Sequence, residues 1–222
     1  KREGKLMTLE EAIAKIRPLD HNAMEIAQKR WDGIAKPLHS LGKLETLLIQ
    51  IAGITGNAEV DLSRRGLIAM CADNGVVEEG VTQTGQEVTA IVAENFLKYD
   101  TSVGVMCKQN HAEIFPVDMG MVTDTKVRTD HKIAYGTQNM TKGPAMTREQ
   151  AVKGLEAGID MVRELNDKGY RILATGEMGI GNTTTSSAVA SVLLKQPVEE
   201  MTGRGAGLTS EGLVRKIKKK KK

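Results

Sequence analysis

The residues of this chain best suited to chemistry lie in one glycine-rich stretch, ATGEMGIGNTTTSSAV, at residues 174–189. An apolar run precedes it and small residues follow, which predicts a strand, a tight turn and the start of a helix. Gly179 and Gly181 would let backbone N–H groups approach a phosphate closely, and Asn182 could cap a helix whose N-terminus attracts anions. The stretch is no P-loop, and Thr184 stands where the dinucleotide fingerprint needs Gly or Ala. It therefore predicts either a phosphate site or a plain glycine turn.

Glu177 lies inside this stretch. A carboxylate beside a phosphate site is electrostatically unfavourable unless it serves a neighbouring group. Ribose hydroxyls are a natural partner, because a carboxylate accepts two hydrogen bonds well. The alternative is an exposed loop glutamate without a role.

A second glycine cluster, MTGRGAGL at residues 201–208, follows the expected helix. Arg204 offers a bidentate donor, and Lys216 lies one helical segment later. Together they could complete a phosphate cradle, or they could be surface cations on a flexible loop.

A third candidate is the acidic loop DNGVVEEGVTQ, which runs from Asp73 to Gln83. Paired carboxylates there could act as acid and base, although such residues more often serve turns and solvation. The four histidines have neither metal-ligand spacing nor a Ser-His-Asp order, so we expect no metal site: His21, His39, His111 and His131.

The elements that would position these residues follow from capping signals and hydrophobic periodicity. We expect helices that start at the capping boxes Thr8–Glu11 and Thr147–Gln150, the second running to about Lys168. Other helices are expected over residues 20–34, 41–56, 88–99 and 182–194, and strands over 66–75, 111–121 and 170–177.

Strands that alternate with helices predict an α/β fold, a parallel sheet flanked by helices on both faces, after a small N-terminal helical subdomain. Ligands of such sheets bind beyond the carboxyl ends of the strands, where loops 72–80, 117–121 and 174–182 would meet. We expect a helical subdomain over 1–60, an α/β nucleotide-binding domain over 61–217 and a lysine tail over 218–222.

Composition excludes several classes of protein. The formal net charge is +3, but six lysines lie in the last seven residues, so the rest of the chain is mildly acidic and offers no surface for nucleic acid. Such lysine runs are usually solvated and disordered. No apolar run is long enough to span a membrane, and there is no apolar signal core. Cys71 and Cys107 lack CxxC spacing, so we expect two buried thiols and a cytoplasmic protein.

Taken together, the motifs resemble one family. TGEMGIGNTTTSSAV, TGRGAGL and EGLVRK occur in the order found in nicotinate-nucleotide–dimethylbenzimidazole phosphoribosyltransferases, as do KPLHSLGKLE, ADNGVVEEGVT, EVTAIVAENFL and FPVDMGM. The resemblance extends to about Ile217. It implies a Rossmann-like homodimer without a cofactor or a metal. It also implies transfer of the 5-phosphoribosyl group of nicotinate mononucleotide to dimethylbenzimidazole or a related base, which gives α-ribazole 5′-phosphate and nicotinate in cobalamin biosynthesis.

The resemblance also implies roles by position. Glu177 matches a glutamate near the ribose and is the implied catalytic residue. The phosphate side is matched by Gly179, Ile180, Gly181, Asn182 and Thr183, and further along by Arg204, Gly205 and Lys216. Asp73 belongs to the matching acidic loop, and Thr82, Gln83 and Ile91 match the base pocket.

Two departures from the family pattern affect what can be expected. Ile91 stands where the family often has glutamine, a loss of one hydrogen bond that would alter the preferred base, and Gly85 replaces a proline. The glutamate that acts as general base in the family lies beyond the matched part, so we expect these 222 residues to lack it.

A non-catalytic relative that binds a mononucleotide or a base is the alternative. An unrelated nucleotide protein such as a dehydrogenase and a lysine-driven nucleic-acid binder are more distant ones.

Overall fold

The computed structural model describes residues 6–220. The chain divides into two compact units, one over Met7–Arg64 and one formed mainly by the residues from Arg65 onward. The first five residues of the predicted helical subdomain and the last two of the predicted lysine tail lie outside the described residues. Within residues 6–220, none of the helices is long and apolar enough to cross a bilayer.

The unit over Met7–Arg64 is helical, with α1 (Leu9–Ala14), α2 (His21–Asp32) and α3 (Lys43–Thr55). The capping box at α1 is present: Glu11 N–H donates to the Thr8 hydroxyl at 3.2 Å, and Thr8 N–H donates to the Glu11 carboxylate at 3.0 Å. Small residues let α2 and α3 pack closely, because a Cβ at Gly53 would lie 2.7 Å from the Met24 side chain. Gly56, at φ +65°, ends α3 in the left-handed conformation that glycine favours.

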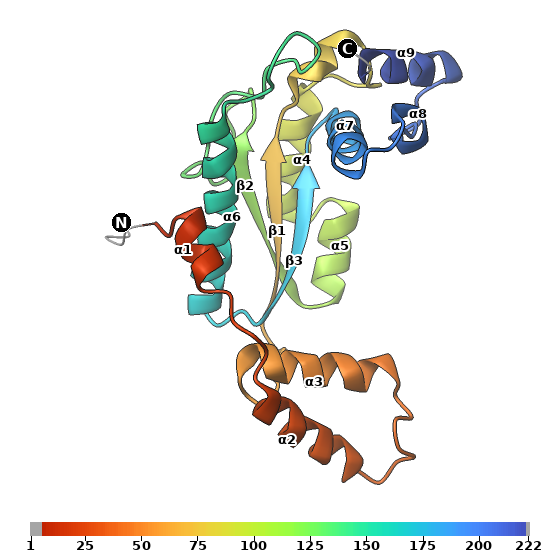
Figure 1. Ribbon diagram of the computed structural model, residues 1–222. Helices are drawn as coiled ribbons and strands as arrows, with labels where there is room; N and C mark the ends of the chain where they lie inside the picture. Colours follow the sequence, from red (N-terminus) through yellow and green to blue (C-terminus); the bar gives the residue numbers. More distant parts are fainter. Residues whose placement is uncertain (1–5, 221–222) are drawn as a thin grey trace. The chain divides into compact units, whose positions relative to one another are not determined.

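The second unit is built on a three-stranded parallel sheet in the order β2–β1–β3 (Figure 1). The strands are β1 (Arg65–Ala72), β2 (Ala112–Gly120) and β3 (Ile172–Met178). Between them and after them run η1 (Gly75–Glu79), α4 (Glu87–Lys98), α5 (Ser102–Gln109), α6 (Arg148–Asp167), α7 (Asn182–Leu194), α8 (Val198–Met201) and α9 (Ser210–Lys220). The predicted α/β class, with N-terminal helices, is confirmed.

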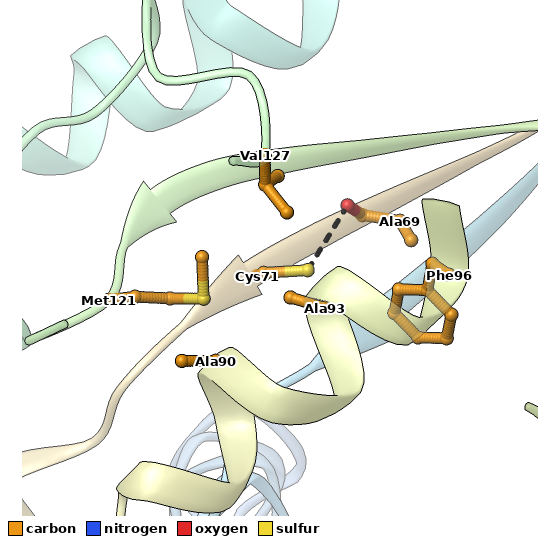
Figure 2. Packing of buried hydrophobic residues seen from close by; sticks show 7 residues of the cluster. All are labelled: Ala69, Cys71, Ala90, Ala93, Phe96, Met121 and Val127. Atoms are coloured by element: carbon orange, nitrogen blue, oxygen red, sulfur yellow. Dashed lines mark hydrogen bonds between the residues drawn. The ribbon is translucent and has the colours of Figure 1, made fainter. Parts of the chain in front are cut away.

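Helices cover both faces of the sheet because side chains alternate along each strand. On one face, Ala69 and Cys71 of β1 pack against Ala93 and Phe96 of α4 (Figure 2). On the other face, Ile68 of β1 belongs to a cluster with Val117, Met161, Leu165 and Tyr170. This cluster packs α6 against β1 and β2. Burial raises the pKa of the Cys71 thiol to about 12, so this cysteine is an inert core residue.

Besides the short elements η1 and α8, the structure differs from the sequence-based expectations in two places. Helix α5 was not predicted; Thr101 caps it by accepting a hydrogen bond from Gly104 N–H at 2.9 Å. Lys218–Lys220 form the last turn of α9 instead of a disordered tail. They are ordered because Lys219 pairs with Glu79, and Lys220 donates to the hydroxyls of Ser187 and Thr202.

Candidate functional site

The site lies beyond the carboxyl ends of the strands, where Asn74 joins the end of β1 to two other segments. The Asn74 side chain donates to the carbonyl of Ile180 at 3.0 Å and accepts from the Thr185 hydroxyl at 3.2 Å. The Asn74 carbonyl accepts a hydrogen bond from the Gln86 side chain at 3.1 Å. The end of β1 therefore holds both the glycine loop after β3 and the first turn of α7.

The Ile180 peptide is held on its other side as well. Its N–H donates to the Thr89 hydroxyl at 3.0 Å, and Thr89 is fully buried in α4. The glycine loop is thus fixed by two buried side chains that come from different elements. Such a loop is ordered before any ligand arrives, which lowers the entropic cost of binding.

Asp73 anchors the loop after β2. Its carboxylate accepts from Val122 N–H at 2.8 Å, and its backbone carbonyl accepts from Thr137 N–H at 3.0 Å. Burial raises the pKa of this carboxyl, and the hydrogen bonds from Val122 and Thr89 oppose that rise. The structure therefore places Asp73 outside the pocket lining, where it holds the backbone of the segment after β2 through Val122 and Thr137.

Two glycines of the loop are required by close packing. A Cβ at Gly179 would lie 2.2 Å from the carbonyl oxygen of Ala72. Gly181, at φ +91°, is the N-cap of α7 and lies against Val77 and Asn74. The backbone of the loop consequently runs directly over the end of β1, and α7 begins there (Figure 1).

A pocket of about 130 Å³ opens at the N-terminus of α7. Eight of the predicted site residues line it: Thr82, Gln83, Ile180, Gly181, Asn182, Thr183, Arg204 and Lys216. The pocket joins the loop after β1, the glycine loop and the second glycine cluster, three segments that are far apart in the sequence. Gln83 links two of them by donating to the carbonyl of Gly207 at 2.6 Å.

Lys216 provides the buried cation of the pocket. Only 1% of its surface is exposed, and its ammonium group donates to the Thr183 hydroxyl at 2.7 Å and to the Gly203 carbonyl at 3.2 Å. Both of these partners are neutral, and burial lowers the pKa of this lysine. An anion in the pocket would stabilise the charged form of Lys216.

Arg204 and Gly205 complete this side of the pocket. The Arg204 guanidinium donates to the Leu208 carbonyl at 2.8 Å and to the Ser210 hydroxyl at 3.1 Å, which orders the second glycine cluster. Gly205 has φ +62°, and a Cβ there would lie 2.7 Å from the Thr183 hydroxyl oxygen. The backbone at this glycine therefore passes directly over the pocket wall.

Glu177 lies at the end of β3, next to the pocket. Its carboxylate accepts a hydrogen bond from the side chain of Asn182, which itself lines the pocket. Desolvation by the surrounding protein atoms raises the pKa of Glu177, and the bond from Asn182 opposes that rise. The structure thus connects Glu177 to the pocket through one side chain.

Ile91 is not brought to this pocket. It lies on α4 with 57% of its surface exposed.

Helix α9 adds contacts that bring Lys216 into place: Arg215 donates to the Gly80 carbonyl at 2.9 Å, and Lys219 pairs with Glu79.

Sequence reasoning missed Asn74, Thr89 and Thr185, which hold the glycine loop. The Asp-Asn-Gly turn signal marked the position of Asn74, but no local pattern could show partners 106 and 111 residues away. It also missed an apolar cavity of about 230 Å³ between the end of the sheet and α6, lined mainly by Met119, Ile133, Ala145, Met146, Ala151 and Gly154. Among the described residues, no group of three or more His, Cys, Asp or Glu side chains could hold a metal ion.

Known proteins resemble this chain in sequence and in fold. The sequence profile of the DBI_PRT family, described as phosphoribosyltransferase, matches residues 16–221. The chain belongs to this phosphoribosyltransferase family. It is 51% identical over 213 residues to a nicotinate-nucleotide–dimethylbenzimidazole phosphoribosyltransferase of Ruminiclostridium cellulolyticum, covering 95% of this chain and 60% of the relative. A protein of the same description from Clostridium acetobutylicum is 49% identical, with the same coverage.

Solved structures of the phosphoribosyltransferase family agree with the fold. The crystal structure of CobT from Thermus thermophilus superposes with a TM-score of 0.81 at 35% identity, covering 90% of this chain and 61% of that one. A second structure from the same organism, described as a nicotinate-nucleotide–dimethylbenzimidazole phosphoribosyltransferase, gives a TM-score of 0.80 at 34% identity and covers 91% of this chain and 61% of the other. The chain therefore spans about 60% of the length of the curated relatives it matches.

Proposed function

We propose that this chain binds the donor nucleotide of a phosphoribosyl transfer, in which the 5-phosphoribosyl group of nicotinate mononucleotide moves to dimethylbenzimidazole or a related base. The products are nicotinate and α-ribazole 5′-phosphate, an intermediate of cobalamin biosynthesis. The names of the relatives support the substrates and the reaction. The observation that carries the proposal is Lys216, a buried ammonium group whose two hydrogen-bond partners are neutral, in a pocket at the N-terminus of α7.

In this proposal the phosphate occupies the pocket. N–H groups at the N-terminus of a helix have no partner within the helix, and the helix dipole favours an anion there. Lys216, Thr183 and Arg204 supply further donors, and Gly181 and Gly205 leave room for the phosphate to approach the backbone. These contacts would hold the ribose in a fixed place and orientation.

Glu177 is proposed to act on the ribose. Breaking the bond between the ribose and nicotinate develops positive charge on the sugar, which a nearby carboxylate stabilises. The hydrogen bond from Asn182 keeps the Glu177 carboxylate next to the pocket. The attacking ring nitrogen needs a general base, and we place that base outside these 222 residues.

The remaining assignments belong to the same proposal. Thr82 and Gln83 lie on the pocket wall and would meet the acceptor base. Ile91 lies outside this pocket, so its proposed effect on the preferred base rests on the resemblance alone. We also propose a homodimer, as the resemblance implies, and a cytoplasmic location, which the two free cysteines support.

Calorimetry with nicotinate mononucleotide and with its riboside, which lacks the phosphate, tests the binding step. We expect the mononucleotide to bind at least about tenfold tighter, because charge-assisted hydrogen bonds to the phosphate contribute about 1.5–3 kcal/mol each. Equal affinities would exclude a phosphate site in this pocket.

The second candidate function is nucleotide binding without turnover, which the pocket at the N-terminus of α7 would support without a general base. Incubation with nicotinate mononucleotide and dimethylbenzimidazole, followed by mass spectrometry, separates the two candidates. Formation of α-ribazole 5′-phosphate supports transfer by this chain, and nucleotide binding without that product supports the second candidate.

A further inference from the structure

The segment between β2 and α6 contacts the short helix η1 through one buried asparagine. Asn139 is only 7% exposed. Its side-chain amide donates to the carboxylate of Glu78 at 2.5 Å and to the carboxylate of Glu79 at 2.7 Å. An amide group has two N–H donors, so both are used, each on a different carboxylate. Asn139 therefore holds two neighbouring negative charges in place at the C-terminal end of η1.

Glu79 connects this arrangement to α9. Its carboxylate also accepts a hydrogen bond from the Thr141 hydroxyl at 2.9 Å and pairs with the ammonium group of Lys219. Lys219, Asn139 and Thr141 lower the pKa of Glu79 to about 2, so this carboxylate is charged at neutral pH. Because the segment after β2 holds it through charge-assisted hydrogen bonds, the carboxylate offers Lys219 a partner in a fixed position.

The contacts between η1 and α9 lie on either side of Lys216 in the sequence. Lys219 comes three residues after Lys216, and Arg215 comes directly before it. Arg215 donates to the carbonyl of Gly80, the residue that ends η1, at 2.9 Å. A shift of α9 at these contacts would move the Lys216 ammonium group relative to its partners in the pocket.

We propose that Asn139 is a positioning residue for the phosphate of the donor nucleotide. It keeps the Glu79 carboxylate in place for Lys219 and thereby sets where α9 docks. The docked α9 in turn sets where the Lys216 ammonium group lies in the pocket at the N-terminus of α7. Asn139 itself does not line that pocket, so it acts only through η1 and α9. The inference rests on the proposed function, because it concerns the phosphate site of the same pocket.

Asn139→Asp in the 222-residue chain tests the proposal with little change in side-chain shape. It replaces two donors with a third negative charge, so repulsion should turn the Glu79 carboxylate away from Lys219. We expect affinity for nicotinate mononucleotide to fall by about threefold to tenfold, as for substitutions that reach a site through a chain of contacts, and affinity for the riboside to stay within about twofold. Calorimetry measures both. An equal loss for the two ligands, or no loss for the mononucleotide, would overturn the proposal.

Asn166→Asp is the matched control. It adds the same charge at an exposed position near the end of α6, where the side chain accepts a hydrogen bond from Arg171. Affinity for both ligands should equal that of the unsubstituted chain. If Asn166→Asp weakens binding of the mononucleotide as much as Asn139→Asp does, the effect comes from net charge and the proposal is wrong. Circular dichroism checks that both variants fold.

A double-mutant cycle separates positioning from a general loss of stability. Lys219→Met removes the α9 side of the ion pair and should weaken binding of the mononucleotide to a similar extent. Asn139→Asp added to Lys219→Met should then weaken it by less than about twofold more, because residues that act through the same contact are not additive. Fully additive losses would contradict the proposed chain of contacts.

Amide hydrogen exchange provides a readout without any ligand. In Asn139→Asp, exchange over Ser210–Lys220 should speed up at least about threefold, and exchange over Arg65–Ala72 of β1 should not change, because only the docking of α9 is weakened. Unchanged exchange in α9 would overturn the proposal. Equal affinities of the unsubstituted chain for the mononucleotide and the riboside would instead exclude the proposed phosphate site, so the two failures are distinct.

Discussion

Two regions of the α/β unit both begin at the end of β3. They differ in whether their polar groups have hydrogen-bond partners and in whether their apolar side chains are buried. In the glycine loop, the N–H and the C=O of Ile180 both have buried side-chain partners. Along the free edge of β3 and the outer side of α7, apolar side chains such as Val192 are exposed. In the first region the polar groups of the peptide are paired within the chain, and in the second region large apolar side chains are exposed to solvent. Nucleotide binding should therefore depend on the first region and be indifferent to the second.

The largest expected effect is on the buried ammonium group. Lys216→Met should weaken binding of nicotinate mononucleotide by about tenfold to a hundredfold, because a charged hydrogen-bond partner contributes about 1.5–3 kcal/mol. Calorimetry measures the change, and Lys218→Met on the exposed side of the same helix is the control. A similar loss in both variants would mean that the lysine run acts only through its overall charge.

The next largest effect is expected on the stability of the protein when the buried Asn74 is replaced. Asn74→Ala removes the donor to the Ile180 carbonyl and the acceptor for Thr185, so we expect the free energy of unfolding to fall by about 1–3 kcal/mol. Urea denaturation measures the loss, and the exposed Asn57→Ala serves for comparison. A stable Asn74→Ala variant with unchanged nucleotide affinity would show that the loop holds its shape without this side chain.

Glycine-to-alanine substitutions should have effects of opposite sign at two positions. Gly181→Ala should cost about 1–2 kcal/mol, because its φ of +91° strains any residue with a Cβ and Val77 lies 3.0 Å from the added atom. Gly158→Ala, in the middle of α6 with no atom within 4 Å of its Cβ, should stabilise the chain by about 0.5–1 kcal/mol. Thermal denaturation of both variants checks the sign, and a neutral Gly181→Ala would contradict a tightly packed loop.

Nucleotide affinity is expected to depend more weakly on pH. Because burial lowers the pKa of Lys216, this lysine loses its proton as pH rises at a lower pH than an exposed lysine does. Nucleotide affinity should therefore be full while Lys216 is protonated and should fall as pH rises through its lowered pKa, by at most about tenfold per pH unit. Calorimetry across this range, repeated with Lys218→Met, should give the same profile for both proteins.

The smallest effect is expected from a substitution on the exposed side of α7. Leu193→Asp should change the free energy of unfolding by less than about 0.5 kcal/mol and should leave nucleotide affinity within about twofold, because its side chain is already 75% exposed in the chain alone. A large loss of nucleotide affinity in this variant would break the separation between the two regions.

The parts of the fold that were predicted depend on local signals. The capping boxes at Thr8 and Thr147 fix the starts of α1 and α6 through bonds between residues three apart, and both bonds are present. Strand β3 and helix α7 follow from the change from an apolar run to glycines and then to small residues. Helix α5 escaped prediction because its eight residues are too few to show a clear period.

The candidate site was only partly accessible from sequence. The glycines, Arg204 and Lys216 could be proposed because their residue types suit an anion. The side chains that hold the loop could not, since Asn74 looks like an ordinary turn residue and its partners are distant in the chain. The order of Lys219 and Lys220 was also hidden, because it depends on Glu79, Ser187 and Thr202.

The contacts of α9 have a consequence for the time at which the site forms. Arg215 and Gly80 are 135 residues apart in sequence, and Lys216 reaches back 33 residues to Thr183. Contacts between residues so distant close slowly, and a ribosome releases the earlier residues first. During synthesis the sheet and the glycine loop can fold before α9 emerges. The nascent chain would then gain its affinity for nucleotide in one step, when α9 docks.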